Sequence, residues 1–212
     1  MIKNFNINKK STQSGRSMIE MLGVLAIVGV LSVGGIAGYS KAMQKFKINK
    51  SIDQISHIVA NIRALYAQQT TYDGLNANTA IDMGVVPSEM IDAPFLINPF
   101  NGNSWIDSGY FDNNKVFSIS YEGLDVETCI ALASYDWGDK HSSGLIGVEI
   151  ASVSYYTISN LSSGNMGNFR CDGISSGYYI CAGKKMSLVD AQQNCNYIFN
   201  EHGHLAFNLV YQ

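Results

Sequence analysis

The chain has 212 residues, of which 46% are hydrophobic and 15% are charged, and its formal net charge is −3. The charge is unevenly divided: residues 1–50 carry eight Lys or Arg and one acid, whereas residues 51–212 carry six against sixteen, a net charge of −10. The acidic charge of residues 51–212 excludes a broad basic face that would bind nucleic-acid phosphates. The length leaves room for one apolar helix and one medium-sized domain.

Residues 18–39 are almost wholly apolar. As a helix they would be about 33 Å long, which is enough to cross a bilayer. Glu20 is the one charged group in this run. An unpaired carboxylate in hydrocarbon costs at least a few kcal/mol, so we expect Glu20 to be functional and to need a partner. Residues 1–15 carry three lysines and no acid, which predicts a cytoplasmic N-terminus and an exported remainder.

Three plainer interpretations compete for the apolar run. The apolar part of a cleaved secretory signal usually spans about 7–15 residues and ends in small residues, and residues 33–38 match such a site only weakly. A simple membrane anchor explains the length and the flanking charge but not Glu20. A buried core helix is disfavoured because the run has the length of a bilayer.

The stretch GRSMIEML, from Gly15 to Leu22, resembles the type III signal of type IV pilins and pseudopilins. The resemblance implies that prepilin peptidase cuts between Gly15 and Arg16, that Arg16 is N-methylated, and that Glu20 is the fifth mature residue. In that family this glutamate meets the N-terminal amine of a neighbouring subunit during assembly. Arg16 stands where the family usually has an apolar residue, and its guanidinium is placed to compete for Glu20 within one helix. A leader of 15 residues is similar to those of the type IVb group.

The helical pattern continues beyond the apolar run. Steps of three and four predict an amphipathic helix that packs on a globular head, with a continuous helix over residues 17–69 ending near Gly74. A coiled-coil seam is the alternative, but the stripe is shorter than three heptads and lacks flanking charge pairs. The stripe consists of Ile48, Ile52, Ile55, Val59, Ile62 and Tyr66, widened by Ile58 and Leu65.

Residues 72–212 are predicted to form an α+β head of mostly antiparallel strands. Asp125 is placed to cap a helix over residues 126–134, and Ser187 opens a capping box for a helix through Cys195. The other expected elements are a short helix at 78–84, a turn at 98–103, a hairpin of 104–110 with 116–121, and strands at 145–151, 153–159, 178–181 and 205–211.

The order of motifs in this head is similar to that of the major pilin of type IVb thin, conjugative (PilS-type) pili. The matching stretches are YDGL at 72–75, GVVP at 84–87, NPFNG at 98–102, and FSISY at 117–121 followed by ETC at 127–129. The resemblance covers most of the chain and implies a long helix packed on an antiparallel sheet. It implies a leader at 1–15, a helix at 16–71 with an assembly segment at 18–39 and an amphipathic part at 40–71, and a head at 72–212.

The function implied is that of a structural subunit that polymerises with its own copies into an extracellular filament. Its partners would be prepilin peptidase, the inner-membrane assembly machinery and, before assembly, the inner membrane, which it spans once with a cytoplasmic N-terminus. A pseudopilin of a type II secretion system and an adhesive minor pilin at a filament tip are the alternatives.

Four cysteines in an exported domain predict two disulfides, with three possible connectivities. Cys171 and Cys181 bracket a Gly/Ser-rich loop, so a local bridge is easy there. That choice leaves Cys129 with Cys195, joining two helices across the head. Zinc is the rival for these cysteines, but no CxxC pair is present.

The sequence offers little for catalysis, and we expect no catalytic residue, no cofactor and no nucleic-acid partner. His202 and His204 would form a metal pair if they lay on one strand, but a polar turn before the last strand is the plainer interpretation. Asp136 and Asp139 offer a weak calcium motif. We therefore expect no metal site.

Overall fold

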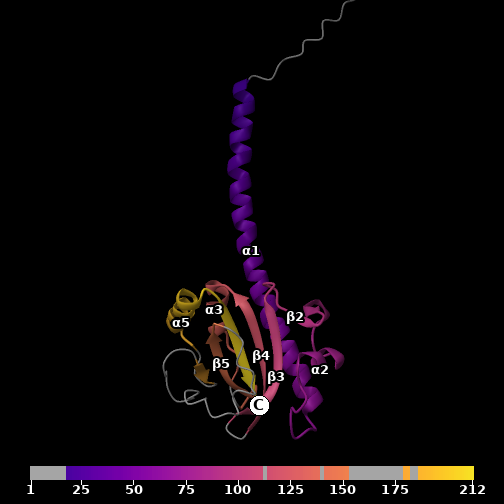
Figure 1. The fold of residues 1–212 in the computed structure, drawn as a ribbon. Helices are drawn as coiled ribbons and strands as arrows, with labels where there is room; N and C mark the ends of the chain where they lie inside the picture. The colour runs from indigo at the N-terminus through magenta and orange to yellow at the C-terminus, as the bar shows by residue number, and fades with distance from the viewer. Residues whose placement is uncertain (1–17, 112–113, 139–140, 153–178, 182–185) are drawn as a thin grey trace, which may run out of the picture. The chain divides into compact units, whose positions relative to one another are not determined.

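The computed structural model describes residues 18–111, 114–138, 141–152, 179–181 and 186–212 (Figure 1). It divides into two compact units, Met1–Met43 and Gln44–Gln212. The predicted cleavage site at Gly15 and Arg16 and the predicted strand at 153–159 lie outside the described residues.

The first helix, α1, runs from Met18 to Tyr66 and ends three residues before the predicted end. The backbone N–H of Gln69 donates to the carbonyl of Tyr66 at 2.9 Å, which closes a turn. The chain then folds back, so that the rings of Tyr66 and Tyr72 lie 5.2 Å apart. The chain therefore leaves the helical direction before Gly74, the residue near which the helix was predicted to end.

The second part of α1, from Gln44 onward, packs on the head through one face, as its spacing predicts. Most of the predicted stripe is buried or partly buried, but Leu65 is exposed, and that part of the prediction is wrong. The reason is that the last turn of α1 meets the core through the Tyr66 ring instead. Two polar residues that the stripe did not include, Ser51 and Gln54, are buried on this face.

The strands among the described residues form a seven-stranded sheet in the order β1-β2-β3-β4-β7-β5-β6, and all the neighbours are antiparallel (Figure 1). The C-terminal strand therefore lies inside the sheet, between β4 and β5. The strands are β1 (Ile91–Asp92), β2 (Phe95–Ile97), β3 (Asn103–Phe111), β4 (Asn114–Leu124), β5 (Leu145–Ala151), β6 (Tyr179–Cys181) and β7 (Leu205–Tyr211).

The main hydrophobic core includes alternate residues of β4 and β7. Phe117 pairs with Tyr211, and Tyr121 pairs with Phe207, so side chains of both strands project to the same side. These residues belong to one buried cluster with α1, α3 (Val126–Ala133) and α5 (Leu188–His202). A helix layer on one sheet confirms the α+β prediction.

Capping residues define the shorter helices. Asn76 caps α2 (Ala77–Asp82), Pro87 precedes the 3-10 turn η1 (Ser88–Met90), and Asp125 caps α3 by accepting a hydrogen bond from the Thr128 N–H at 2.7 Å. Ser187 caps α5 as predicted, but α5 extends to His202 rather than ending at Cys195. The helix continues because its first terminator is Gly203, which adopts the left-handed conformation at φ 76°.

A disulfide joins Cys129 of α3 to Cys195 of α5, which is the pairing expected from the sequence. Both cysteines are fully buried, and the bridge links residues 66 positions apart. Cys171 lies outside the described residues, so the second expected bridge, to Cys181, stays a prediction.

Candidate assembly site

In the first unit, the part of α1 from Met18 to Met43 exposes almost every apolar side chain that it carries. By length and composition, α1 is a helix that can cross a membrane, and none of its most apolar window is buried by the rest of the chain. Five glycines lie in this part, and a Cβ added at any of them would meet no atom within 4 Å. The surface is therefore apolar, with small gaps where a neighbouring helix can approach closely.

Glu20 lies in the first turn of α1 and is exposed. A negative charge is favoured there, because the first N–H groups of a helix carry a partial positive charge. Within the described part of the chain, Glu20 forms no ion pair. Its suggested intrachain competitor, Arg16, lies outside that part, so the pairing of Glu20 stays a prediction.

In the second unit, Gln44 ties α1 to the disulfide-bonded helix α3. Its amide nitrogen donates to Asp125 Oδ2 at 2.7 Å and to Thr128 Oγ1 at 2.9 Å. Asp125 is also the cap of α3, so one carboxylate orders the start of α3 and contacts α1. Gln44 was not among the residues predicted from the sequence. The available signal was its position four residues before Ile48, on the face that packs against the head.

A second polar contact lies deeper between α1 and the sheet. The hydroxyl of Tyr121 donates to Gln54 Oε1 at 3.2 Å, and the amide nitrogen of Gln54 donates to Glu89 Oε1 at 3.4 Å. Burial raises the pKa of Tyr121, so it remains a donor. The pKa of Glu89 is lowered, first by a hydrogen bond from its own backbone N–H and further by Gln54 and by Lys50, whose Nζ lies 3.8 Å away.

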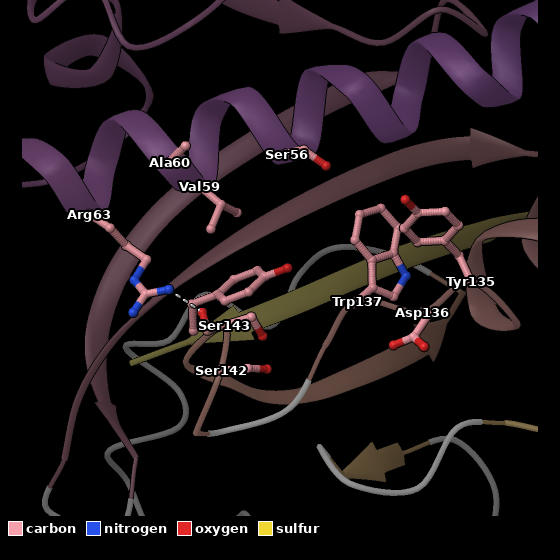
Figure 2. Close-up of a pocket in the computed structure, with 10 residues that line it drawn as sticks. Ser56, Val59, Ala60, Arg63, Tyr135, Asp136, Trp137, Ser142 and Ser143 are labelled. Atoms are coloured by element: carbon pink, nitrogen blue, oxygen red, sulfur yellow. Dashed lines mark hydrogen bonds between the residues drawn. The ribbon is translucent and has the colours of Figure 1, made fainter.

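A cavity of about 510 Å³ opens between α1 and the segment that follows α3 (Figure 2). Arg63 reaches across it, with Nη1 donating to the backbone carbonyl of Ser143 at 2.5 Å. On the other side, the rings of Tyr135 and Trp137 meet edge to face at 4.7 Å, and Trp137 Nε1 donates to the carbonyl of Leu132 at 2.8 Å. The lining residues are Ser56, Val59, Ala60, Arg63, Tyr135, Asp136, Trp137, Ser142, Ser143 and Tyr211.

The cavity combines one guanidinium, one carboxylate and several hydroxyl groups. The pKa of Tyr211 is raised, mainly by burial, and that of Tyr72 is raised for the same reason, although the Arg63 charge opposes both shifts. Both phenols therefore stay protonated at neutral pH. This cavity was not predicted from the sequence, because its lining comes from three segments that lie far apart in the chain.

The weak metal motifs are not assembled into a larger cluster. The described residues contain no group of three or more His, Cys, Asp or Glu placed to hold an ion. His202 ends α5, whereas β7 begins at Leu205, so His202 and His204 do not share a strand. Asp136 accepts a hydrogen bond from the Gly138 N–H at 3.1 Å, and Asp139 lies outside the described residues.

A helix whose first part is exposed and apolar, and whose second part packs on an antiparallel sheet, is the architecture of a type IV pilin. The crystal structure of TcpA, a type IV pilin from Vibrio cholerae El Tor biotype, has this fold. It aligns with a TM-score of 0.52 over 78% of this chain and 99% of that chain, at 16% sequence identity.

The sequence comparisons define the family. A model described as Bundlin matches residues 40–177, well over half of the chain. The major structural subunit of bundle-forming pilus from Escherichia coli O111:H- is 28% identical over 155 residues, which are 71% of this chain and 78% of that protein. The toxin coregulated pilin of Vibrio cholerae is 28% identical over 131 residues, 59% of this chain and 58% of that protein. The chain belongs to the Bundlin family and is a type IVb pilin.

Proposed function

We propose that this chain is a prepilin that is cut after Gly15 and polymerised with its own copies into an extracellular pilus. Before assembly it spans the inner membrane once, with its N-terminus in the cytoplasm and its head outside. Prepilin peptidase and the inner-membrane assembly machinery act on it. One relative is the major structural subunit of bundle-forming pilus and another is a toxin coregulated pilin, and this proposal gives the chain the role of a pilus subunit.

The observation that carries the proposal is the exposed apolar surface of α1 from Met18 to Met43. An apolar surface of this length is stable only where other apolar groups cover it. Lipid supplies that cover before assembly, and the helices of neighbouring subunits supply it in a filament. The glycines along the helix allow those neighbours to pack closely.

Glu20 has the role of setting the stagger between subunits. A carboxylate in an apolar filament core must be neutralised or paired, and the N-terminal amine of a neighbour supplies the opposite charge. The pair forms only at one relative position along the filament axis. Because desolvation cancels much of the attraction, its main contribution is to register rather than to net stability.

Processing tests the proposal. Intact-mass analysis of the exported chain should give a mature protein beginning at Arg16, and Gly15→Val should leave an uncut precursor. Gly23→Val makes the same substitution outside the cleavage site, at a position where an added Cβ meets no atom within 4 Å; we expect normal cleavage of this control. A mature chain beginning after Val33 would instead show processing by an ordinary signal peptidase and would exclude the pilin route.

A further inference from the structure

Four lysines follow the apolar run within eleven residues: Lys41, Lys45, Lys47 and Lys50. If the chain is inserted as proposed, these lysines lie on the translocated side, where positive charge is usually depleted. An excess of positive charge on that side therefore needs its own physical explanation.

Two of the four lysines have partners in the head. The Nζ of Lys47 lies 5.6 Å from the centroid of the Phe100 ring, a cation–π contact. The Nζ of Lys50 lies 3.8 Å from Glu89 Oε1. These two charges are therefore used within the second unit.

The other two lysines have no such contact. Lys41 and Lys45 are exposed, and neither forms an ion pair with a described residue. Exposed aromatic residues lie near both in the chain: Tyr39, two positions before Lys41, is 67% exposed, and Phe46, directly after Lys45, is 59% exposed. Aromatic rings beside basic residues, directly after a bilayer-length apolar segment, are typical of the level of lipid headgroups.

We propose that Lys41 and Lys45 bind the phosphate of anionic phospholipids, phosphatidylglycerol in particular, in the outer leaflet of the membrane that holds the subunit before assembly. Each ammonium offers three donors to phosphate oxygens, and each aliphatic stem lies along the acyl region. The inference rests on the membrane placement proposed above and adds a ligand class to it. The acidic head of another subunit is the rival partner, but it would not account for the flanking aromatic residues.

Native mass spectrometry tests the proposal. The chain is held in non-ionic detergent micelles with equal amounts of phosphatidylglycerol and phosphatidylcholine of matched acyl chains, and the ratio of the two bound lipids is measured. The wild-type chain should retain phosphatidylglycerol preferentially. A basic residue near an anionic surface changes binding by about five-fold, so the Lys41→Gln/Lys45→Gln variant should lower the ratio of the two bound lipids by at least that factor. The Lys47→Gln/Lys50→Gln variant loses the same charge and should leave the ratio unchanged. The lysines of the leader are present in all three chains and cancel in the comparison.

An equal fall in both double variants, or none in either, would overturn the lipid site. So would an unchanged lipid ratio in Lys41→Gln/Lys45→Gln together with loss of that variant from filaments, which would assign the two lysines to a neighbouring head. Flotation of the chain with vesicles of pure phosphatidylcholine tests the placement separately. Failure to float would overturn both proposals, whereas flotation without a lipid preference would overturn only the lipid site.

Discussion

Replacing Tyr121 by phenylalanine removes one hydroxyl group from the contact between α1 and the sheet. The tyrosine side chain is fully buried, and Gln54, which accepts its hydrogen bond, is only 4% exposed. The ring itself fills the same space in the variant, so no large cavity forms. The variant therefore isolates the hydrogen bond from the packing.

The expected loss follows from the group left behind. In Tyr121→Phe, Gln54 Oε1 loses its donor in a place that water does not reach. A buried acceptor without a partner costs about 1–3 kcal/mol, whereas replacing both partners by apolar groups is nearly neutral. Tyr121→Phe and Gln54→Leu should each lower the free energy of unfolding by about that amount, and the double variant should lose much less than their sum.

Urea titration of the full chain in mild detergent, followed by tryptophan fluorescence, measures these values. Tyr110→Phe is the matched control, because Tyr110 is exposed and its hydroxyl lies 3.5 Å from Asp73 Oδ1; its effect should stay within about 0.5 kcal/mol. Additive losses in the double variant, or a Tyr121→Phe protein as stable as the control, would refute a stabilising role for this hydrogen bond between α1 and the sheet.

Three further predictions concern other parts of the chain. Removing the α3–α5 disulfide by a double alanine substitution should cost about 4 kcal/mol, because the bridge closes a loop over 66 positions; calorimetry showing no loss would contradict this. Gly102→Ala places a Cβ 1.9 Å from a backbone carbonyl of β4, whereas Gly74→Ala meets no atom within 4 Å and incurs only the backbone strain of its left-handed φ of 83°. Urea titration should therefore show the larger loss of stability for Gly102→Ala. Glu20→Ala, co-expressed with the wild-type chain, should be cleaved and folded but excluded from sheared filaments. The control Glu201→Ala should enter the filaments. Incorporation of Glu20→Ala at its cellular proportion would rule out a role of Glu20 in setting the register.

Local chemistry predicted much of the head. A single cap, Asp125, determines where α3 begins, and runs of β-branched and aromatic residues matched β5 and β7 to the residue. These elements were predictable because neighbouring residues decide them. Helix ends were harder: α5 continues past Cys195 because nothing stops it before Gly203, and α1 ends early because Tyr66 packs on Tyr72.

Contacts between distant segments were not predictable. Gln44 and Gln54 look like ordinary polar residues on an amphipathic helix. Only the fold shows that Gln44 is hydrogen-bonded to Asp125 and Gln54 to Tyr121. The cavity beside Arg63 has the same origin, since its walls come from segments that the sequence separates widely. Glu20, the proposed assembly residue, could be picked out from the sequence, because it is the one charged group in an apolar run.

The position of β7 has a consequence for how the head is made. Residues 205–211 form a strand between β4 and β5, so each of those two strands has a neighbour on one side only until residues 205–211 are in place. Until then, β4 and β5 each present an unpaired backbone edge, which readily pairs with another chain. The sheet of this head therefore cannot be completed piece by piece along the chain. A subunit halted shortly before residue 205 would hold most of the head in an unfinished form, with two strand edges open to pairing with other chains.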